Sequence, residues 1–275
     1  MIQTLVALFG LAFGSFLNVC ILRVPRRESI VRPGSHCPAC GNSIRWHDNI
    51  PVVSYVLLRG RCRNCGKRIS PLYPLVEILT AAVFLLEFAR YGLTPEFIKG
   101  VVFAMLMIIL IFTDFRERRI PHKVTLFGMA LGLALSALVP VDDRPIGWIL
   151  AHWGFFPSEV LLSLMAALAG ALIGGGLFFL VGEVFYHLRH KEGLGFGDVM
   201  LMLVVGVFFG PLLTLMTVLL GSLLGTFIAI PLTLVSSKFR DYQWPYGSFL
   251  GIAALYASVG GEALLRAYLQ WGGFR

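Results

Sequence analysis

Long runs of uncharged residues alternate with short polar loops along this chain. Asp, Glu, Lys and Arg are absent from residues 1–22, 100–113, 124–141, 160–182, 199–237 and 242–261. Most of these runs can cross about 30 Å of hydrocarbon as a helix that rises about 1.5 Å per residue. Residues 74–89 add a further apolar segment, interrupted by Glu77 and Glu87. The pattern therefore predicts a series of membrane-spanning helices.

The run 199–237 is too long for a single crossing. As one helix it would measure roughly 58 Å, about twice what a bilayer requires. Gly210-Pro211 lies inside the run and is typical of a turn, so we expect two helices that meet there. With this division the sequence predicts about eight transmembrane helices. The three glycines at 174–176 indicate close packing of the helix that carries them.

The composition excludes a water-soluble protein. Hydrophobic residues make up 57% of the 275 residues, charged residues make up 14%, and the mean hydropathy is +0.80. Such a chain has too few polar side chains to cover a soluble globule of this size. We therefore predict the all-α fold class of a polytopic membrane protein.

The distribution of Lys and Arg predicts the orientation in the membrane. If the N-terminus faces outside, loops 23–73, 114–123, 187–198 and 236–246 face the cytoplasm and hold 18 of the 23 basic residues. The positive-inside rule expects this bias. Positive charges follow the first apolar run and none precedes it, so we interpret that run as a retained anchor and not as a cleaved signal.

The net charge of +8 is concentrated in one loop. Residues 23–73 hold ten Lys and Arg against Glu28 and Asp48, which by itself gives +8. A basic loop could bind nucleic acid, but membrane topology and attraction to anionic lipid explain the charge more simply. We therefore expect membrane lipid, and not nucleic acid, as its partner.

Two Cys-x2-Cys pairs in the same loop predict a metal site. The pairs are separated by 21 residues, close to the spacing of structural four-cysteine zinc sites. Gly41 and Gly66 follow the second cysteine of each pair and permit the tight turn that brings two thiolates together. The four cysteines are Cys37, Cys40, Cys62 and Cys65.

Zinc is the metal that this loop favours. A reducing cytoplasm argues against disulfides, and about fifty residues with few apolar side chains need a staple to hold a fold. A redox pair and an iron site stay open as alternatives. We interpret His36 and His47 as surface residues, and Cys20, in the first helix, as a small buried apolar residue.

Asp114 and Asp198 are the acidic residues that most strongly indicate chemistry. Asp114 directly follows one apolar run, and Asp198 directly precedes another within Gly195-Phe196-Gly197-Asp198. Carboxylates beside hydrocarbon are costly and by default indicate a functional site. In the topology above both lie at similar depth on the cytoplasmic side. Gly195 and Gly197 leave room beside Asp198 for a substrate or a neighbouring helix.

Two carboxyl groups held close together can hydrolyse an amide. The ionised one takes a proton from water while the protonated one polarises the carbonyl, because like charges a few ångströms apart cannot both ionise. We therefore predict that Asp114 and Asp198 form a catalytic pair. Three alternatives stay open: Asp198 caps a helix, Asp114 is merely solvated, or the two relay ions or protons in a zinc-stapled transporter. Glu77, near the cysteine loop, could orient that loop or serve a second reaction.

These features resemble those of the bacterial type IV prepilin peptidases, which are bifunctional leader peptidases and N-methyltransferases of the Gly-x-Gly-Asp membrane aspartyl proteases. The matching segments are spread over nearly the whole chain. They are residues 13–19, the two Cys-x2-Cys pairs, residues 69–77, Asp114 with Pro121, residues 195–198 and residues 245–249.

The resemblance implies an activity and a location. Asp114 and Asp198 would cleave the leader peptide from a pilin or pseudopilin precursor at the cytoplasmic face of the bacterial inner membrane, in pilus assembly or protein secretion. A methyl group from S-adenosylmethionine would then pass to the new N-terminal amine. The division implied is a transmembrane anchor at 1–22, a zinc-binding loop domain associated with methyl transfer at 23–73, and a peptidase domain at 74–275.

The resemblance also suggests residues for methyl transfer. Gly60 matches a glycine that the family links to methylation, and Glu77 is a second candidate. The family often has a lysine two residues after the second aspartate, where this chain has Met200. That difference removes any role for such a lysine and leaves the aspartate pair intact.

Overall fold

The computed structural model describes residues 1–141, 144–190, 194–235, 242 and 244–272. Within these ranges every regular element is a helix, and the β-pairing consists of the isolated bridges His36–Ser43 and Arg61–Arg68 in the cysteine loop. The predicted all-α class is therefore confirmed. Parts of the basic loops 187–198 and 236–246 lie outside the described residues.

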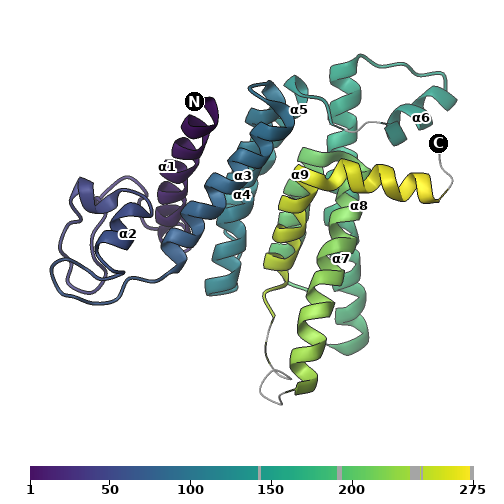
Figure 1. The fold of residues 1–275 in the computed structure, drawn as a ribbon. Coiled ribbons are helices and arrows are strands. Elements are labelled where there is room, and N and C mark those ends of the chain that lie inside the picture. The colour runs from purple at the N-terminus through teal and green to yellow at the C-terminus, as the bar shows by residue number, and fades with distance from the viewer. Residues whose placement is uncertain (142–143, 191–193, 236–241, 243, 273–275) are drawn as a thin grey trace. The chain divides into compact units, whose positions relative to one another are not determined.

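The first of two compact units is Met1–Ile109. It contains α1 (Ile2–Arg23), the 3-10 helix η1 (Trp46–Asn49), α2 (Val53–Leu57), α3 (Leu72–Tyr91) and most of α4 (Pro95–Glu117) (Figure 1). Its apolar core joins three of these helices through Val6, Phe84, Phe97 and Val101.

Helices α1 and α3 lie side by side and antiparallel. Gly10 packs on Ala81 and Gly14 packs on Glu77, and a Cβ on either glycine would lie 2.6 Å from a Cα of α3. Glycines four residues apart let two membrane helices approach at backbone distance, so this spacing explains the close pair.

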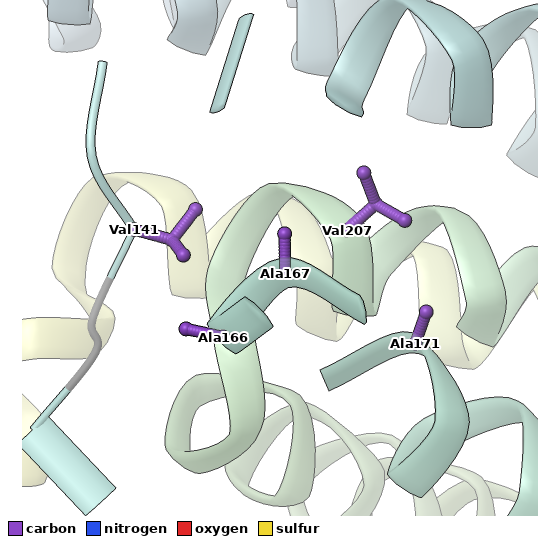
Figure 2. Packing of buried hydrophobic residues seen from close by; sticks show 5 residues of the cluster. All are labelled: Val141, Ala166, Ala167, Ala171 and Val207. Atoms are coloured by element: carbon purple, nitrogen blue, oxygen red, sulfur yellow. The ribbon is translucent and has the colours of Figure 1, made fainter. Parts of the chain in front are cut away.

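The second unit is Leu110–Arg275. It contains the end of α4 and the helices α5 (His122–Leu138), α6 (Arg144–His152), α7 (Glu159–Arg189), α8 (Phe196–Val235) and α9 (Tyr246–Trp271). Small side chains dominate one core cluster, formed by Val141, Ala166, Ala167, Ala171 and Val207 (Figure 2). The close packing expected of glycines 174–176 holds for Gly174 and Gly175, which pack on α8, whereas a side chain at Gly176 would meet nothing within 4 Å.

Helix α8 reverses direction at Gly210. This residue has φ 72° and ψ −173°, which is not helical, and Pro211 follows it. A Cβ on Gly174 would lie 2.9 Å from the carbonyl oxygen of Met202 and 2.7 Å from Cγ2 of Thr214. Twelve residues of straight helix span about 18 Å, so both halves can lie against Gly174 only if the chain folds back. The predicted turn at Gly210-Pro211 is therefore confirmed.

The count of spans agrees roughly with the predicted eight. Among the described residues, 6 helices are long and apolar enough to cross a membrane, and α8 is one of them. The shorter apolar helix α5 and the second half of α8 complete the predicted set. The chain is thus a multi-pass membrane protein. The division by activity into 1–22, 23–73 and 74–275 stays a prediction.

Candidate active site and metal centre

Asp114 and Asp198 come together beside the first turn of α9. Asp114 lies in the last turn of α4 and Asp198 in the first turn of α8, and both are buried. A Cβ on Gly247 would lie 2.9 Å from Oδ1 of Asp198 and 3.1 Å from Oδ2 of Asp114. These two oxygens are therefore at most the sum of those distances, 6.0 Å, apart. At such a separation the charge on one buried carboxylate disfavours ionisation of the other, which is the arrangement that the predicted catalytic pair requires.

Ser248 holds Asp114 in place. Its backbone N–H donates to Oδ2 of Asp114 over 2.7 Å, and its Oγ lies 2.9 Å from the same oxygen. The same Oγ is 3.0 Å from the carbonyl oxygen of Ile111, one turn before Asp114 in α4. Ser248 therefore fixes both the carboxyl group and the helix that carries it.

Asp198 is held by its own helix start. The backbone N–H of Gly195 hydrogen-bonds to its carboxylate, and its backbone N–H donates to the carbonyl of Gly195 over 2.9 Å. The capping alternative is therefore partly realised, and it coexists with the approach to Asp114 because a carboxylate has two oxygens. The room that Gly197 was predicted to leave beside Asp198 is occupied by Ile120, because a Cβ on Gly197 would lie 2.9 Å from Cβ of Ile120.

Ile120, Gly247 and Ser248 were missed as site residues by sequence reasoning. Ile120 packs against both Gly197 and Gly247, since a Cβ on Gly247 would lie 2.8 Å from its Cδ1. Residues 245–249 contributed to the family resemblance but carried no assigned role. The sequence signal that could have identified Gly247 and Ser248 is a glycine followed by a polar residue at the start of an apolar run. Such a pair can bring a helix end close to polar side chains.

The four cysteines converge. Their Sγ atoms all lie within 4.8 Å of one another, and Sγ of Cys37 is 3.9 Å from Sγ of Cys65. Tetrahedral zinc with Zn–S bonds of about 2.3 Å separates its sulfur ligands by roughly 3.8 Å, so this arrangement fits the ion closely. Among the described residues, the potential ligand group contains these cysteines and neither His36 nor His47. The predicted convergence of the four cysteines is confirmed, and their sulfur atoms can hold a metal ion; that they bind zinc stays a prediction.

Each cysteine pair sits on the same kind of turn. The N–H of Cys37 donates to the carbonyl of Asn42, and the N–H of Gly41 donates to the carbonyl of Cys37. At the second pair, the N–H of Cys62 donates to the carbonyl of Lys67, and the N–H of Gly66 donates to the carbonyl of Cys62. Gly41 and Gly66 have φ 71° and 68°, so both occupy the left-handed region that their position was predicted to require.

The environment of the cysteines favours a bound cation. Backbone N–H groups of Ala39 and Cys40 hydrogen-bond to Cys37 and lower its pKa to about 6. The N–H of Asn42 by itself lowers the pKa of Cys40, but desolvation and the three neighbouring thiols raise that pKa to about 11. One thiolate thus forms readily and opposes ionisation of its neighbours, and a divalent cation would remove that conflict.

An ion pair links the second cysteine turn to η1. Arg63, between Cys62 and Cys65, donates to both carboxylate oxygens of Asp48 at 2.8 and 2.6 Å. The hydrogen bond from Arg63 lowers the pKa of Asp48. The segment between the two cysteine pairs is therefore attached to the second cysteine turn.

Glu77 and Gly60 lie in the first unit, in and beside the loop. Glu77 is buried in α3 and accepts a hydrogen bond from the backbone N–H of Val52 over 2.8 Å. Gly60 has φ 65°, and a Cβ there would lie 3.0 Å from the ring of Tyr55. Met200, where the family often has lysine, is buried in α8.

Comparison with known proteins gives two matches to family models. The model described as "Bacterial Peptidase A24 N-terminal domain" matches residues 8–91, and the one described as "Type IV leader peptidase family" matches residues 101–230. No solved structure was found to match the chain.

Several curated proteins are similar to the chain. A prepilin leader peptidase/N-methyltransferase of Myxococcus xanthus is 36% identical over 83% of this chain and 62% of its own length. Proteins of the same name from Pseudomonas putida and Pseudomonas aeruginosa are 30% and 31% identical over 98% of this chain, and the match spans 95% and 93% of their lengths.

Proposed function

Because this chain belongs to the type IV leader peptidase family, we propose that it cleaves the leader from type IV prepilin or pseudopilin precursors and then methylates the new N-terminus. Asp114 and Asp198 form the catalytic pair. The observation that carries this assignment is the approach of both carboxyl groups to one point beside Gly247.

Cleavage follows from a single proton shared between the two aspartates. The ionised carboxylate takes a proton from water as the water oxygen attacks the scissile carbonyl carbon, and the protonated partner donates to the carbonyl oxygen. When the C–N bond breaks, the aspartate that received the water proton gives it to the leaving amine, and a hydroxyl of the intermediate returns a proton to the other aspartate. Ser248 keeps Asp114 oriented through both steps.

Methyl transfer is assigned to the loop domain at 23–73. The new N-terminal amine attacks the methyl carbon of S-adenosylmethionine, the carbon–sulfur bond breaks, and the amine releases a proton to solvent. Gly60 and Glu77 shape the loop for this step. Zinc, held by Cys37, Cys40, Cys62 and Cys65, supplies a structural staple when bound.

The proposed location is the bacterial inner membrane. The N-terminus faces outside and the aspartate pair faces the cytoplasm, where the basic leader of a precursor lies. This orientation is supported by the distribution of 18 of 23 basic residues in the predicted inward loops.

The test is a mass measurement on a single product. The purified full chain in phosphatidylcholine and phosphatidylglycerol vesicles is incubated with a precursor and S-adenosylmethionine. We expect loss of the leader followed by a gain of one methyl group. Intact precursor, or ion flux across the vesicles without cleavage, would contradict the proposal.

A further inference from the structure

The segment between the two cysteine turns is tied to the membrane helices at Val52. This β-branched residue has φ 60° and ψ −47°, a left-handed conformation that such residues rarely adopt. The N–H of Val53 donates to the carbonyl of Pro51, which closes a three-residue turn around Val52. The N–H of Val52 thereby points at the carboxylate of Glu77. Strain of this kind persists only where the surroundings impose it, so the attachment to Glu77 fixes the local fold.

Glu77, to which Val52 is attached, lies inside the predicted membrane span of α3 and not at its end. On α1 the neighbour of Glu77 is Gly14, where an added Cβ would lie 2.6 Å from Cα of Glu77. Gly14 is nine residues before Arg23, about 14 Å along the helix from the loop end. The side chain of Glu77 leans toward the N-terminus of α3, which is also the loop end, so Val52 lies somewhat shallower than this. With the loop end of α1 at the membrane surface, that depth corresponds to the boundary between lipid headgroups and acyl chains.

Helix α2 starts at this depth and presents an apolar face. Val53, Val56 and Leu57 are spaced three and four residues apart and are 49%, 66% and 76% exposed. The opposite face is occupied, because Ser54 is buried and donates to the carbonyl of His47 over 2.9 Å. An apolar face open to water would be a liability in a cytoplasmic loop.

Basic side chains follow this helix in the chain. Arg59 and Arg61 come directly after α2 and are exposed, and residues 23–73 together carry a charge of +8. Aliphatic side chains bordered by arginines are typical of helices that lie in the interface of an anionic membrane.

We propose that α2 is an interfacial membrane anchor. Val53, Val56 and Leu57 insert between the headgroups and the first acyl carbons, and Arg59 and Arg61 bind anionic phosphates. The lipid bilayer is thus the partner of this surface. Gly60, just after α2, is held at the membrane surface as a consequence. The placement of α2 does not depend on the chemistry of the aspartates.

The experiment compares two matched positions of the same loop. Leu57 is 76% exposed and Val31 is 77% exposed, so Leu57→Trp and Val31→Trp both fit without repacking. Residues 29–34 wrap around Arg23, at the end of α1, because Arg23 donates to the carbonyls of Ser29 and Pro33. Val31 therefore serves as a control nearer to water than Leu57.

Each full-length variant is placed in nanodiscs of phosphatidylcholine and phosphatidylglycerol, with or without bromine at carbons 6 and 7 of the acyl chain. The emission added by the new tryptophan at position 57 should fall at least about twofold with brominated lipid and should resist quenching by acrylamide. The emission added at position 31 should be quenched by acrylamide and should resist quenching by brominated lipid. Retained zinc content checks that each variant is folded.

Three results would overturn the proposal. Quenching of position 57 by acrylamide alone would place α2 in water, and protection from both quenchers would mean that protein covers it. Equal lipid quenching at both positions would show that no special depth belongs to α2. Glu77→Ala in the Leu57→Trp chain provides a second check, because removal of the attachment should reduce the lipid quenching at least about twofold.

Discussion

The cysteine loop and the aspartate pair are assembled by interactions of very different range. The cysteines lie on two similar turns, each closed by its own backbone hydrogen bonds. Asp114 is oriented by Ser248, which is 134 residues away, and Asp198 comes from a third helix. The cysteine turns therefore depend on local chain geometry, whereas the aspartate pair depends on how α4, α8 and α9 pack. The two should fail independently when the chain is altered.

The largest expected effect on cleavage comes from replacing the aspartates themselves. Asp114→Asn or Asp198→Asn should each lower cleavage by about a thousandfold or more, because neither amide can exchange the shared proton. Bound zinc should stay unchanged, since the cysteines lie in the other unit. Peptide cleavage and metal content are measured on the same sample, and Glu262→Gln, an exposed acid on α9, is the control.

The reverse experiment removes the metal centre. Cys62→Ser or strong chelation should release zinc and reduce methylation by about a hundredfold, while cleavage changes by less than about threefold. Cys20→Ser is the matched control because Cys20 is a buried thiol in α1, outside the cysteine cluster. Equal loss of both activities would show that the two regions are coupled.

Packing around the aspartates is tested by a single methyl group. Gly247→Ala would place Cβ within 3.1 Å of both carboxylates and of Ile120, so the pair must move apart. We expect cleavage to fall by about 10- to 100-fold, as is usual for small misplacements of catalytic groups. Gly176→Ala, where nothing lies within 4 Å, should leave cleavage unchanged.

The same contrast in range explains what the sequence could predict. Cysteine spacing and the glycines after each pair indicated the metal turns because every relevant contact lies within a few residues. The turn at Gly210-Pro211 was predictable for a similar reason, since length and local propensity decide it. The close packing of Gly247 and Ile120 against the aspartates could not be predicted. Gly247 lies next to Asp198 and Asp114 only after three helices have packed together.

The position of Glu77 in an apolar segment indicated a role for this residue but did not indicate its contact with Val52. Glu77 was expected to orient the loop or serve a second reaction, and the structure shows its bond to Val52. Nothing in the local sequence predicts the positive φ of Val52, because β-branched residues strongly prefer negative φ. Positions where a tertiary contact overrides local propensity cannot be found by propensity.

A smaller effect should separate backbone strain from a specific contact in the loop. Gly60 and Gly66 have φ 65° and 68°, but a Cβ at Gly60 meets Tyr55 at 3.0 Å and one at Gly66 meets nothing within 4 Å. Gly60→Ala should therefore reduce methylation about tenfold, and Gly66→Ala, which adds only the strain, should reduce it less. Methyl incorporation into an already cleaved pilin measures this step alone.

A comparable effect is expected at Ser248, whose hydroxyl has one proton and two neighbouring oxygens. When Asp114 is ionised the hydroxyl can donate to it, and when Asp114 is protonated the hydroxyl can accept from it while donating to Ile111. Ser248→Ala keeps the backbone N–H contact but removes this adaptable partner.

We expect Ser248→Ala to reduce kcat for cleavage by about tenfold with little change in KM, because a hydrogen bond to a charged group contributes about 1.5 kcal/mol. Ser248→Thr should restore much of the rate, and the pH dependence of kcat should differ between the Ala and Thr variants. Thr217→Val is the matched control, since this buried hydroxyl bonds only within α8, to the carbonyl of Leu213 over 2.8 Å. A lower Tm with an unchanged pH profile would mean that Ser248 supports the packing of α9 and not the protonation of Asp114.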